Sequence, residues 1–333
     1  MAATIYPARR VITMNPAFPF AEAVAVRDGR VLGVGTVEEL AGWGEHSVDN
    51  TFADKVLTPG FIEAHTHVMA GGVWQFPYVG FFDRKDPHGK LWKGCKNVEE
   101  VLDRLAEYES AITDPAEPLI AWGLDPLYFD EERLVAVHLD RVSTDRSIYV
   151  YHASGHLATV NTALLERSEI NEHTTTPGVA RNADNTPNGE LQEPAAMSLA
   201  SAGMVDLMKA IGSDTAKWNY AYEARNAGHT LVTDLGTTRV NDAESLDSWR
   251  KATDDPAYPA RVMVAGAPAF GGPADPDELA GIVTELKSQT TDKLRFGIVK
   301  LVLDGSIQGF TARISWPYYY NPPEGADENG LWL

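Results

Sequence analysis

The stretch Leu-Thr-Pro-Gly-Phe-Ile-Glu-Ala-His-Thr-His-Val, residues 57–68, decides the interpretation of this sequence. A short β-prone run leads through Pro59-Gly60 into a predicted strand that ends with His65 and His67. Side chains two residues apart in a strand project from the same face, so the two imidazoles are expected side by side. Neutral imidazole is the commonest protein ligand for zinc and related metals. Because a catalytic metal needs more than two protein ligands, the pair is half of a site.

A bare His-x-His is more often a pair of solvated or core histidines near a strand end. The surrounding residues change this balance, because the stretch resembles the first-strand signature of the amidohydrolase superfamily, Pro-Gly-Phe-(Ile/Val)-Asp-x-His-x-His. Glu63 stands where that signature usually has Asp. The resemblance favours a metal site at His65 and His67.

Composition limits the classes of partner. The 333 residues include 28 basic and 47 acidic ones, a net charge of −19, which argues against nucleic acid or an anionic membrane as partner. The single cysteine, Cys95, excludes an internal disulfide and a cysteine-cluster zinc site. No apolar run approaches the length of a membrane span, and the N-terminus lacks the apolar core of a signal peptide. A cytoplasmic protein that acts on a small molecule is expected.

Residues 1–57 are predicted to form short strands. Asp28-Gly29 between apolar runs predicts a hairpin, and Thr36 with Glu39 predicts a capped helical turn. The phrase Ala-Glu-Ala-Val-Ala-Val-Arg-Asp-Gly-Arg-Val at 21–31 resembles the opening of the same family. The resemblance implies that residues 1–57 are the N-terminal part of a small β-sandwich domain, and that residues 58–333 belong to a barrel with an insertion around 75–200.

The second half of the chain alternates strands with helices. Strands are predicted at 229–236, 260–266 and 294–305, and helices at 213–227, 241–251 and 275–288. Strands that alternate with helices of this length indicate parallel β/α units and an α/β fold.

His156 follows a predicted strand at 147–156 and precedes residues 157–167, which are predicted to be helical. The phrase His-Ala-Ser-Gly-His-Leu-Ala-Thr-Val-Asn-Thr-Ala-Leu-Leu at 152–165 resembles a motif of one branch of the superfamily, Asp-Gly-His-x-x-x-x-Asn-x-x-Ala-Leu, with Ser154 in place of its Asp. His156 is either a substrate contact or a polar residue that closes the turn, and both interpretations stay open. Gly-Glu-Leu-Gln-Glu at 189–193 resembles the Gly-x-Leu-x-Glu of the same family.

Trp74 begins an aromatic stretch that extends to Phe82. Such residues fill a core more often than they line a substrate pocket, so core packing is slightly favoured. Trp74 is nevertheless a candidate substrate contact.

Lys300 interrupts an otherwise apolar predicted strand, the fourth of the barrel by chain order. A lone buried ammonium is costly, so it is expected to reach the surface or to pair with Asp304, four residues on and on the same face. The sequence at 299–312 resembles the family phrase Lys-Leu-Phe-x-Asp-Gly-Ala-Leu-Gly-Ser-x-Thr-Ala, although Gln308 and Phe310 depart from it. The resemblance implies a lysine carboxylated by carbon dioxide that bridges two metal ions, and Asp304 as a substrate contact.

These phrases span nearly the whole chain in the expected order and resemble amidohydrolase family 3, the YtcJ-like branch. The resemblance implies a (β/α)8 TIM barrel with its site at the strand C-termini. His65, His67 and Lys300 would hold one or two divalent ions, zinc being expected. Relatives take further histidines from later strands and a catalytic Asp from strand eight, whereas no His follows Lys300 here. The chain is therefore expected to hold only the first part of the barrel, with the base beyond Leu333 and no catalytic residue within it.

Two functions from different classes remain. The first is a hydrolase of amide or other non-peptide C–N bonds, in which metal-activated water attacks the carbonyl; His156, Trp74 and Asp304 would contact the substrate. The second is a truncated, catalytically silent barrel that acts as a binding or assembly module. An open half barrel exposes sheet edges, so a homo-oligomer or a missing C-terminal half is expected to complete it.

Overall fold

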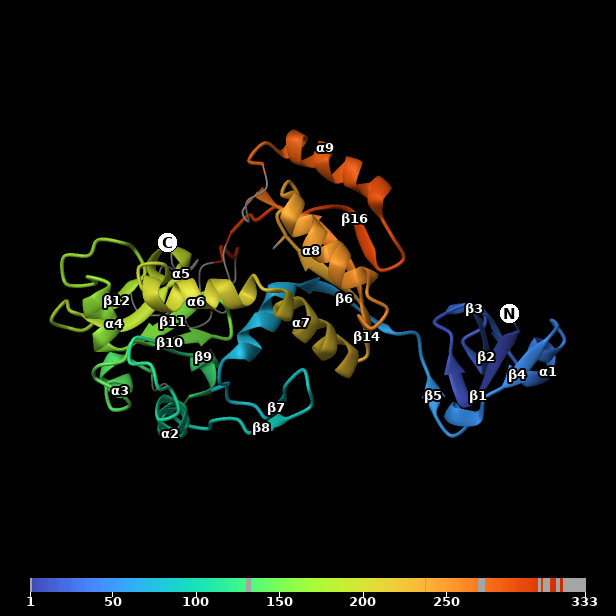
Figure 1. The fold of residues 1–333 in the computed structure, drawn as a ribbon, viewed down its shortest axis with the longest axis horizontal. Helices are drawn as coiled ribbons and strands as arrows, with labels where there is room; N and C mark the ends of the chain where they lie inside the picture. Colours follow the sequence, from blue (N-terminus) through green and yellow to red (C-terminus); the bar gives the residue numbers. More distant parts are fainter. Residues whose placement is uncertain are drawn as a thin grey trace. The chain divides into compact units, whose positions relative to one another are not determined.

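The computed structural model describes residues 2–129, 133–236, 238–268, 273–304, 307, 312–315 and 318–319. Contacts divide the chain into two compact units, Met1–Ile62 and Glu63–Leu333 (Figure 1). Gln308 and Phe310 lie outside the described residues.

The first unit is a five-stranded sheet in the order β3-β2-β1-β4, in which β5 also pairs with β1. Asp28 and Gly29 have φ of 53° and 72°, which is the left-handed turn that a two-residue hairpin requires, and the predicted hairpin is confirmed. The capping box of Thr36 and Glu39 is also confirmed. The elements are β1 (Ala3–Ile12), β2 (Phe20–Arg27), β3 (Arg30–Gly35), α1 (Val37–Ala41), β4 (His46–Val48), η1 (Asn50–Phe52) and β5 (Val56–Leu57).

The second unit contains a four-stranded sheet in the order β16-β15-β14-β6 among its described residues. β14, β15 and β16 are parallel, as the alternation of strands and helices predicted. Three helices pack on this sheet and share one apolar core with it (Figure 1). The strands are β6 (Phe61–Thr66), β14 (His229–Leu235), β15 (Arg261–Gly266) and β16 (Leu294–Val299), and the helices are α7 (Asp214–Asn226), α8 (Ala243–Asp254) and α9 (Pro276–Leu286), with η5 (Lys287–Gln289) after α9.

Between β6 and β14 the chain builds a separate five-stranded sheet in the order β12-β13-β11-β10-β9. Its strands are β9 (Leu119–Leu124), β10 (Ile148–His152), β11 (Leu157–Val160), β12 (Val179–Arg181) and β13 (Pro187–Gln192). Around it lie α2 (Val98–Glu109), η3 (Pro126–Tyr128), α3 (Ala136–Leu139), α4 (Thr162–Arg167), α5 (Glu193–Met197), α6 (Ser201–Ile211) and the two-stranded ribbon of β7 (Arg84–Lys85) and β8 (Leu91–Trp92).

The helix predicted from residue 157 is wrong over its first four residues. Leu157–Val160 is strand β11, which returns antiparallel along β10 with Tyr151 opposite Ala158. Helix α4 begins only after Asn161, whose side chain accepts a hydrogen bond from the Leu164 N–H. The long-range pairing with β10 and β13 overrides the local helical tendency of this segment.

The strand predicted at 294–305 ends at Val299. Its partner β15 ends at Gly266, and the Gly266–Val299 pair is the last of the ladder. Lys300 therefore follows β16 instead of lying within it, although its N–H still donates to the Gly266 carbonyl at 2.9 Å.

The 3₁₀ segment η2 (Val68–Gln75) connects β6 to the five-stranded sheet and packs tightly against α6 and α7. A Cβ on Gly71 would lie 2.1 Å from the Ala216 carbonyl oxygen, and one on Gly72 would lie 2.4 Å from the Ile211 Cα. Only glycine permits this close approach, so the Gly71-Gly72 pair fixes the path of the chain that leaves the histidines.

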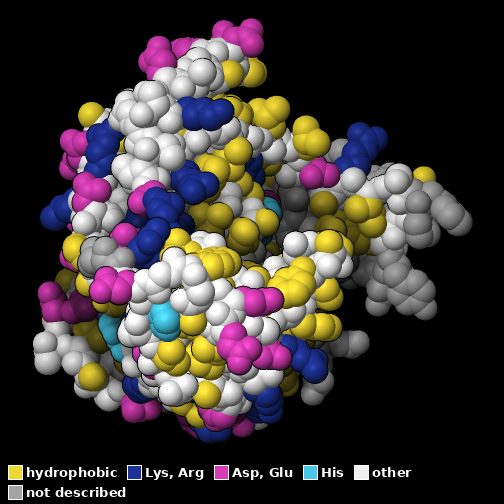
Figure 2. Space-filling model, turned by 90° about the vertical axis from the view of Figure 1, so that its right-hand side faces the viewer, with side chains coloured by type: hydrophobic (Ala, Val, Ile, Leu, Met, Phe, Trp, Pro, Cys, Tyr) yellow, Lys and Arg dark blue, Asp and Glu magenta, His cyan; other side chains and the backbone are white. Residues whose placement is uncertain are grey.

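The surface is mixed in character. On the face shown in Figure 2, acidic and basic side chains are interspersed, with hydrophobic side chains exposed between them. Among the described helices, none combines the length and apolar character that a membrane crossing requires.

Candidate functional site

His65 and His67 lie side by side at the carboxyl end of β6. His65 is in the strand and exposed, whereas His67 is the first residue after it, half-buried, with extended backbone at φ −125° and ψ 100°. Their ring centroids are 5.6 Å apart and the rings are inclined at 75°. The strand alternation thus turns both imidazoles toward one region.

A buried carboxylate that the sequence did not single out anchors this strand end. Asp234, at the carboxyl end of β14, is fully buried; its Oδ1 accepts from the Val68 N–H at 3.0 Å and its Oδ2 accepts from the Thr238 hydroxyl at 2.8 Å. The Trp249 indole in turn donates to the Thr238 hydroxyl at 2.7 Å. This chain of bonds fixes the backbone immediately after His67. Val68 and Asp234 are 166 residues apart in the chain, so no local signal in the sequence revealed this contact.

The electrostatic surroundings of His67 favour its neutral form. Burial lowers the pKa of His67 most, and the positive charge of Lys300 lowers it further, while the Asp234 carboxylate acts in the opposite direction. His65 and His156 add smaller lowering effects. The fold therefore brings His65, His67, Lys300 and His156 into one electrostatic neighbourhood, and it adds Asp234 to them.

His156 lies in the turn between β10 and β11, where a second carboxylate holds its ring. The Nδ1 atom is 2.8 Å from the Glu193 Oε2, and the Glu193 N–H donates to the His156 carbonyl at 2.7 Å. Glu193 is the final residue of the Gly-x-Leu-x-Glu phrase, and its contact with His156 was not anticipated from the sequence.

Trp74 lies near the far end of η2 in a cluster of aromatic rings. Its ring centroid is 4.7 Å from that of Trp122 and 6.0 Å from that of Tyr78. The Arg84 guanidinium stacks over both indoles and donates to the Glu223 Oε1 at 3.0 Å. These contacts place Trp74 against the core of the five-stranded sheet, which is the packing that the sequence slightly favoured.

Asp304 is exposed in the segment that follows β16. Its Oδ2 accepts a hydrogen bond from the Arg313 N–H at 3.0 Å. The bonds of Asp304 thus lie within the segment after Lys300, and its role toward substrate stays a prediction.

Residues 53–330 match the model of the Amidohydrolase family. The chain belongs to the amidohydrolase family. The family resemblance deduced from the His-x-His stretch is thereby confirmed.

Among curated relatives of this amidohydrolase is Protein LONG AFTER FAR-RED 3 of Arabidopsis thaliana, 25% identical over 324 residues that cover 94% of this chain and 52% of that protein. The N-substituted formamide deformylase of Arthrobacter pascens is 26% identical over 241 residues, 70% of this chain and 41% of that enzyme. The chain spans about half the length of the curated relatives it matches.

A solved structure has the same fold. The crystal structure of an uncharacterised metal-dependent hydrolase from Pyrococcus horikoshii OT3 superimposes with a TM-score of 0.58 at 17% sequence identity, covering 95% of this chain and 58% of that chain. At this identity the likeness shows a shared α/β fold and no more.

The amidohydrolase site fits a metal ion in part. His65 and His67 supply two nitrogen donors, and the lowered pKa of His67 keeps its lone pair available at neutral pH, as a metal ligand requires. Within the described ranges, no group of three or more His, Cys, Asp or Glu side chains is arranged to hold a metal ion. The two imidazoles are thus suitable as the ligands that the end of β6 contributes to a metal centre. Such a centre needs further donor atoms.

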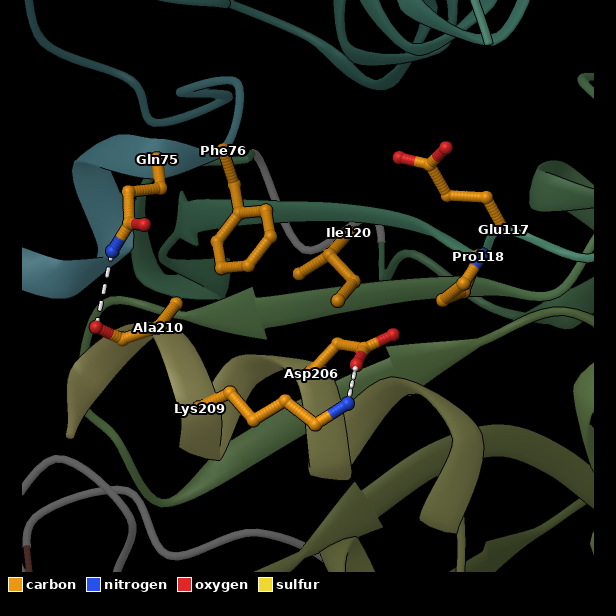
Figure 3. Close-up of a pocket in the computed structure, with 8 residues that line it drawn as sticks. All are labelled: Gln75, Phe76, Glu117, Pro118, Ile120, Asp206, Lys209 and Ala210. Carbon is orange, nitrogen blue, oxygen red and sulfur yellow. Dashed lines mark hydrogen bonds and ion pairs between the residues drawn. The ribbon is translucent and has the colours of Figure 1, made fainter. Parts of the chain in front are cut away.

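A surface depression of about 380 Å³ lies elsewhere, where η2 ends at Gln75, whereas the histidines precede the start of η2. Figure 3 shows the residues that line it. Phe76 and Ile120 form its apolar wall, whereas the Lys209 ammonium is turned along α6 to the Asp206 carboxylate at 2.8 Å. None of the candidate site residues lines this depression. It is therefore distinct from the histidine site.

Proposed function

We propose that this amidohydrolase is a metal-dependent hydrolase of amides or other non-peptide C–N bonds, with His65 and His67 as metal ligands. The observation that carries the proposal is the pair of imidazoles, 5.6 Å apart between ring centroids, on one strand end of an amidohydrolase fold. The buried Asp234 holds the backbone next to them, so their positions are fixed before any ligand binds.

Amide hydrolysis adds water to the carbonyl carbon and breaks the C–N bond, and the nitrogen leaves with a proton as an amine. A bound divalent metal supplies a Lewis acid for the carbonyl and lowers the pKa of water. His65 and His67 contribute neutral nitrogen donors, for which zinc is a suitable ion. In this proposal the site takes one or two ions in a cytoplasmic enzyme.

The positive charge of Lys300 affects whether a metal cation can bind at His67. Its ammonium lies near enough to lower the pKa of His67, and the same charge would oppose a divalent cation held by that imidazole. Carboxylation of Lys300 would replace this repulsion by an anionic oxygen ligand. We include a carboxylated Lys300 as a bridging ligand in the proposal on this argument.

The proposed substrates are N-substituted formamides and related N-acyl compounds. The N-substituted formamide deformylase of Arthrobacter pascens supports this class, and His156, which is near enough to His67 to influence its pKa, is proposed as a substrate contact. Trp74 and Asp304 are proposed as further substrate contacts.

The test is hydrolysis of formanilide by the purified chain loaded with zinc or manganese, followed by release of aniline. We expect the His65→Ala/His67→Ala double variant to lose at least about a thousandfold in rate, because a catalytic metal cannot be held without these donors. The matched control is His46→Ala/His173→Ala, which removes two exposed histidines.

The control variant should retain the rate of the unaltered chain. A double variant at residues 65 and 67 that keeps full activity would refute the assignment of the ligands. An unaltered chain that binds formanilide but hydrolyses it with neither metal would favour a binding module.

A further inference from the structure

The contact between His156 and Glu193 is made twice, once through side chains and once through the backbone. The Nδ1 of His156 lies 2.8 Å from the Glu193 Oε2, and the Glu193 N–H donates to the His156 carbonyl at 2.7 Å. Both side chains are largely sheltered, with 35% of the His156 side chain and 19% of the Glu193 side chain exposed. The backbone bond holds the two residues beside each other, and the side-chain bond orients the His156 ring.

The backbone of Glu193 is strained to make this contact. Its φ is 64°, in the left-handed region that favours glycine, at the point where β13 ends and α5 begins. A non-glycine residue in this region costs about 1 kcal/mol or more. Gln192 pairs with Leu157 in the last step of the ladder, so this conformation of Glu193 sets its carboxylate beside the neighbouring His156.

The bond pattern defines the tautomer of His156. An ionised carboxylate only accepts hydrogen bonds, so the Nδ1 of His156 carries the proton that lies between the two groups. In the neutral ring, Nε2 is then a hydrogen-bond acceptor. Within the part of the chain that the structure describes, Nε2 has no hydrogen-bond partner, so it remains for a ligand.

We propose that Glu193 is a positioning residue that holds His156 with Nδ1–H inward, so that Nε2 accepts a hydrogen bond from the N–H of a secondary amide or N-monosubstituted formamide. This inference rests on the proposed hydrolase function and narrows its substrate class. N,N-disubstituted amides have no N–H to donate, and they would leave Nε2 without a partner. The pair therefore selects substrates by their nitrogen substituents.

The first test is spectroscopic and needs neither metal nor turnover. In the ¹⁵N-histidine-labelled full chain, long-range ¹H–¹⁵N correlation reports which ring nitrogen of His156 carries the proton, with the signal assigned from His156→Gln. We expect the Nδ1–H form in the unaltered chain and a shift toward Nε2–H in Glu193→Ala, whereas Glu193→Gln, whose amide oxygen can still accept from Nδ1–H, should keep the Nδ1–H form. The matched control is Glu172→Gln, because Glu172 lies 3.5 Å from the exposed His173 in an unconstrained pair.

The second test compares formanilide with N-methylformanilide, which lacks the N–H. We expect kcat/KM to favour formanilide in the unaltered chain, and the preference to fall by about tenfold in Glu193→Ala, the scale of one buried hydrogen bond. Glu172→Gln should keep the full preference.

The outcomes separate this inference from the hydrolase proposal. Hydrolysis of both substrates without preference, or an Nε2–H tautomer in the unaltered chain, overturns the inference and leaves the hydrolase function standing. If neither substrate is hydrolysed, the hydrolase function fails. The inference is then decided by titration: a shift of the His156 Nε2 resonance with formanilide alone supports it, and no shift overturns it.

Discussion

The two sheets of the larger unit differ in where their strands meet solvent. In the five-stranded sheet, every residue of β9 and β11 is buried, whereas in the outer strands of the four-stranded sheet four of the six residues of β6 and three of the six residues of β16 are exposed. The exposed strands carry His65, His67 and the Lys300 that follows β16. The comparison shows that the candidate metal ligands lie at the ends of partly exposed strands. The five-stranded sheet, whose strands are more deeply buried, forms the rigid support.

Two histidines at strand ends show the same contrast. His67 is half-buried beside His65, and Lys300 and Asp234 are near enough to influence its pKa. His152, at the end of β10, is fully buried and bonded to the Thr159 hydroxyl at 2.9 Å. Burial lowers the pKa of both, but only His67 lies beside a second imidazole that could share a ligand.

Asp234 gives the largest expected effect on folding stability. Replacement by Ala leaves the buried Val68 N–H and Thr238 hydroxyl without their acceptor, so we expect a loss of about 3 kcal/mol in the free energy of unfolding. Formanilide hydrolysis should fall as well, since the backbone after His67 is released. Urea denaturation and the aniline assay measure the two effects.

Asp234→Asn is the matched variant, because its amide oxygen can still accept from the Val68 N–H. It should lose less stability than Asp234→Ala. Equal stability of the unaltered chain and Asp234→Ala would show that the strand end does not depend on this carboxylate.

The buried His152 is expected to make the folding stability of the chain depend on pH. Burial lowers the pKa of His152 from the ordinary value of 6.5 to about 4, so between these values the unfolded chain binds more protons than the folded chain. Stability is therefore complete above pH 6.5 and is lost as the pH falls toward 4, by on the order of 3 kcal/mol from this residue.

His152→Gln removes this titration, so its stability should decline less steeply over the same range than that of the unaltered chain. The measurement is the free energy of unfolding in urea at pH 7.5, 6 and 5. If the free energy of unfolding depended on pH identically in the two proteins, this would contradict the burial of His152 in the five-stranded sheet.

Lys209 gives the smallest effect. Its ion pair with Asp206 is exposed beside the depression at η2, so Lys209→Ala should change stability by less than about 0.5 kcal/mol. Hydrolysis should be unchanged, because the depression contains none of the candidate site residues. A strong loss of activity in this variant would move the site away from the histidines.

Local signals in the sequence predicted those parts of the fold that depend on short-range chemistry. The Asp28-Gly29 hairpin and the Thr36 capping box are both confirmed. β11 was missed because its strand character comes from pairing with β10 and β13, and the end of β16 was missed because it follows from where β15 stops.

The candidate site divides in the same way. His65 and His67 were found because a two-residue spacing on one strand is itself the signal. Asp234 and the partnership of Glu193 with His156 were missed, because each joins segments that are distant in the chain, by 166 residues in the first case and 37 in the second. Such contacts become visible only when the strands are placed beside one another.

The metal content of the chain tests the central claim most directly. The full chain and its His65→Ala/His67→Ala variant, expressed with supplemented zinc and purified in parallel, are compared by elemental analysis. The account predicts about one or two bound divalent ions per unaltered chain and loss of most of this metal in the variant. Equal metal content in the two proteins, or none in either, would contradict it.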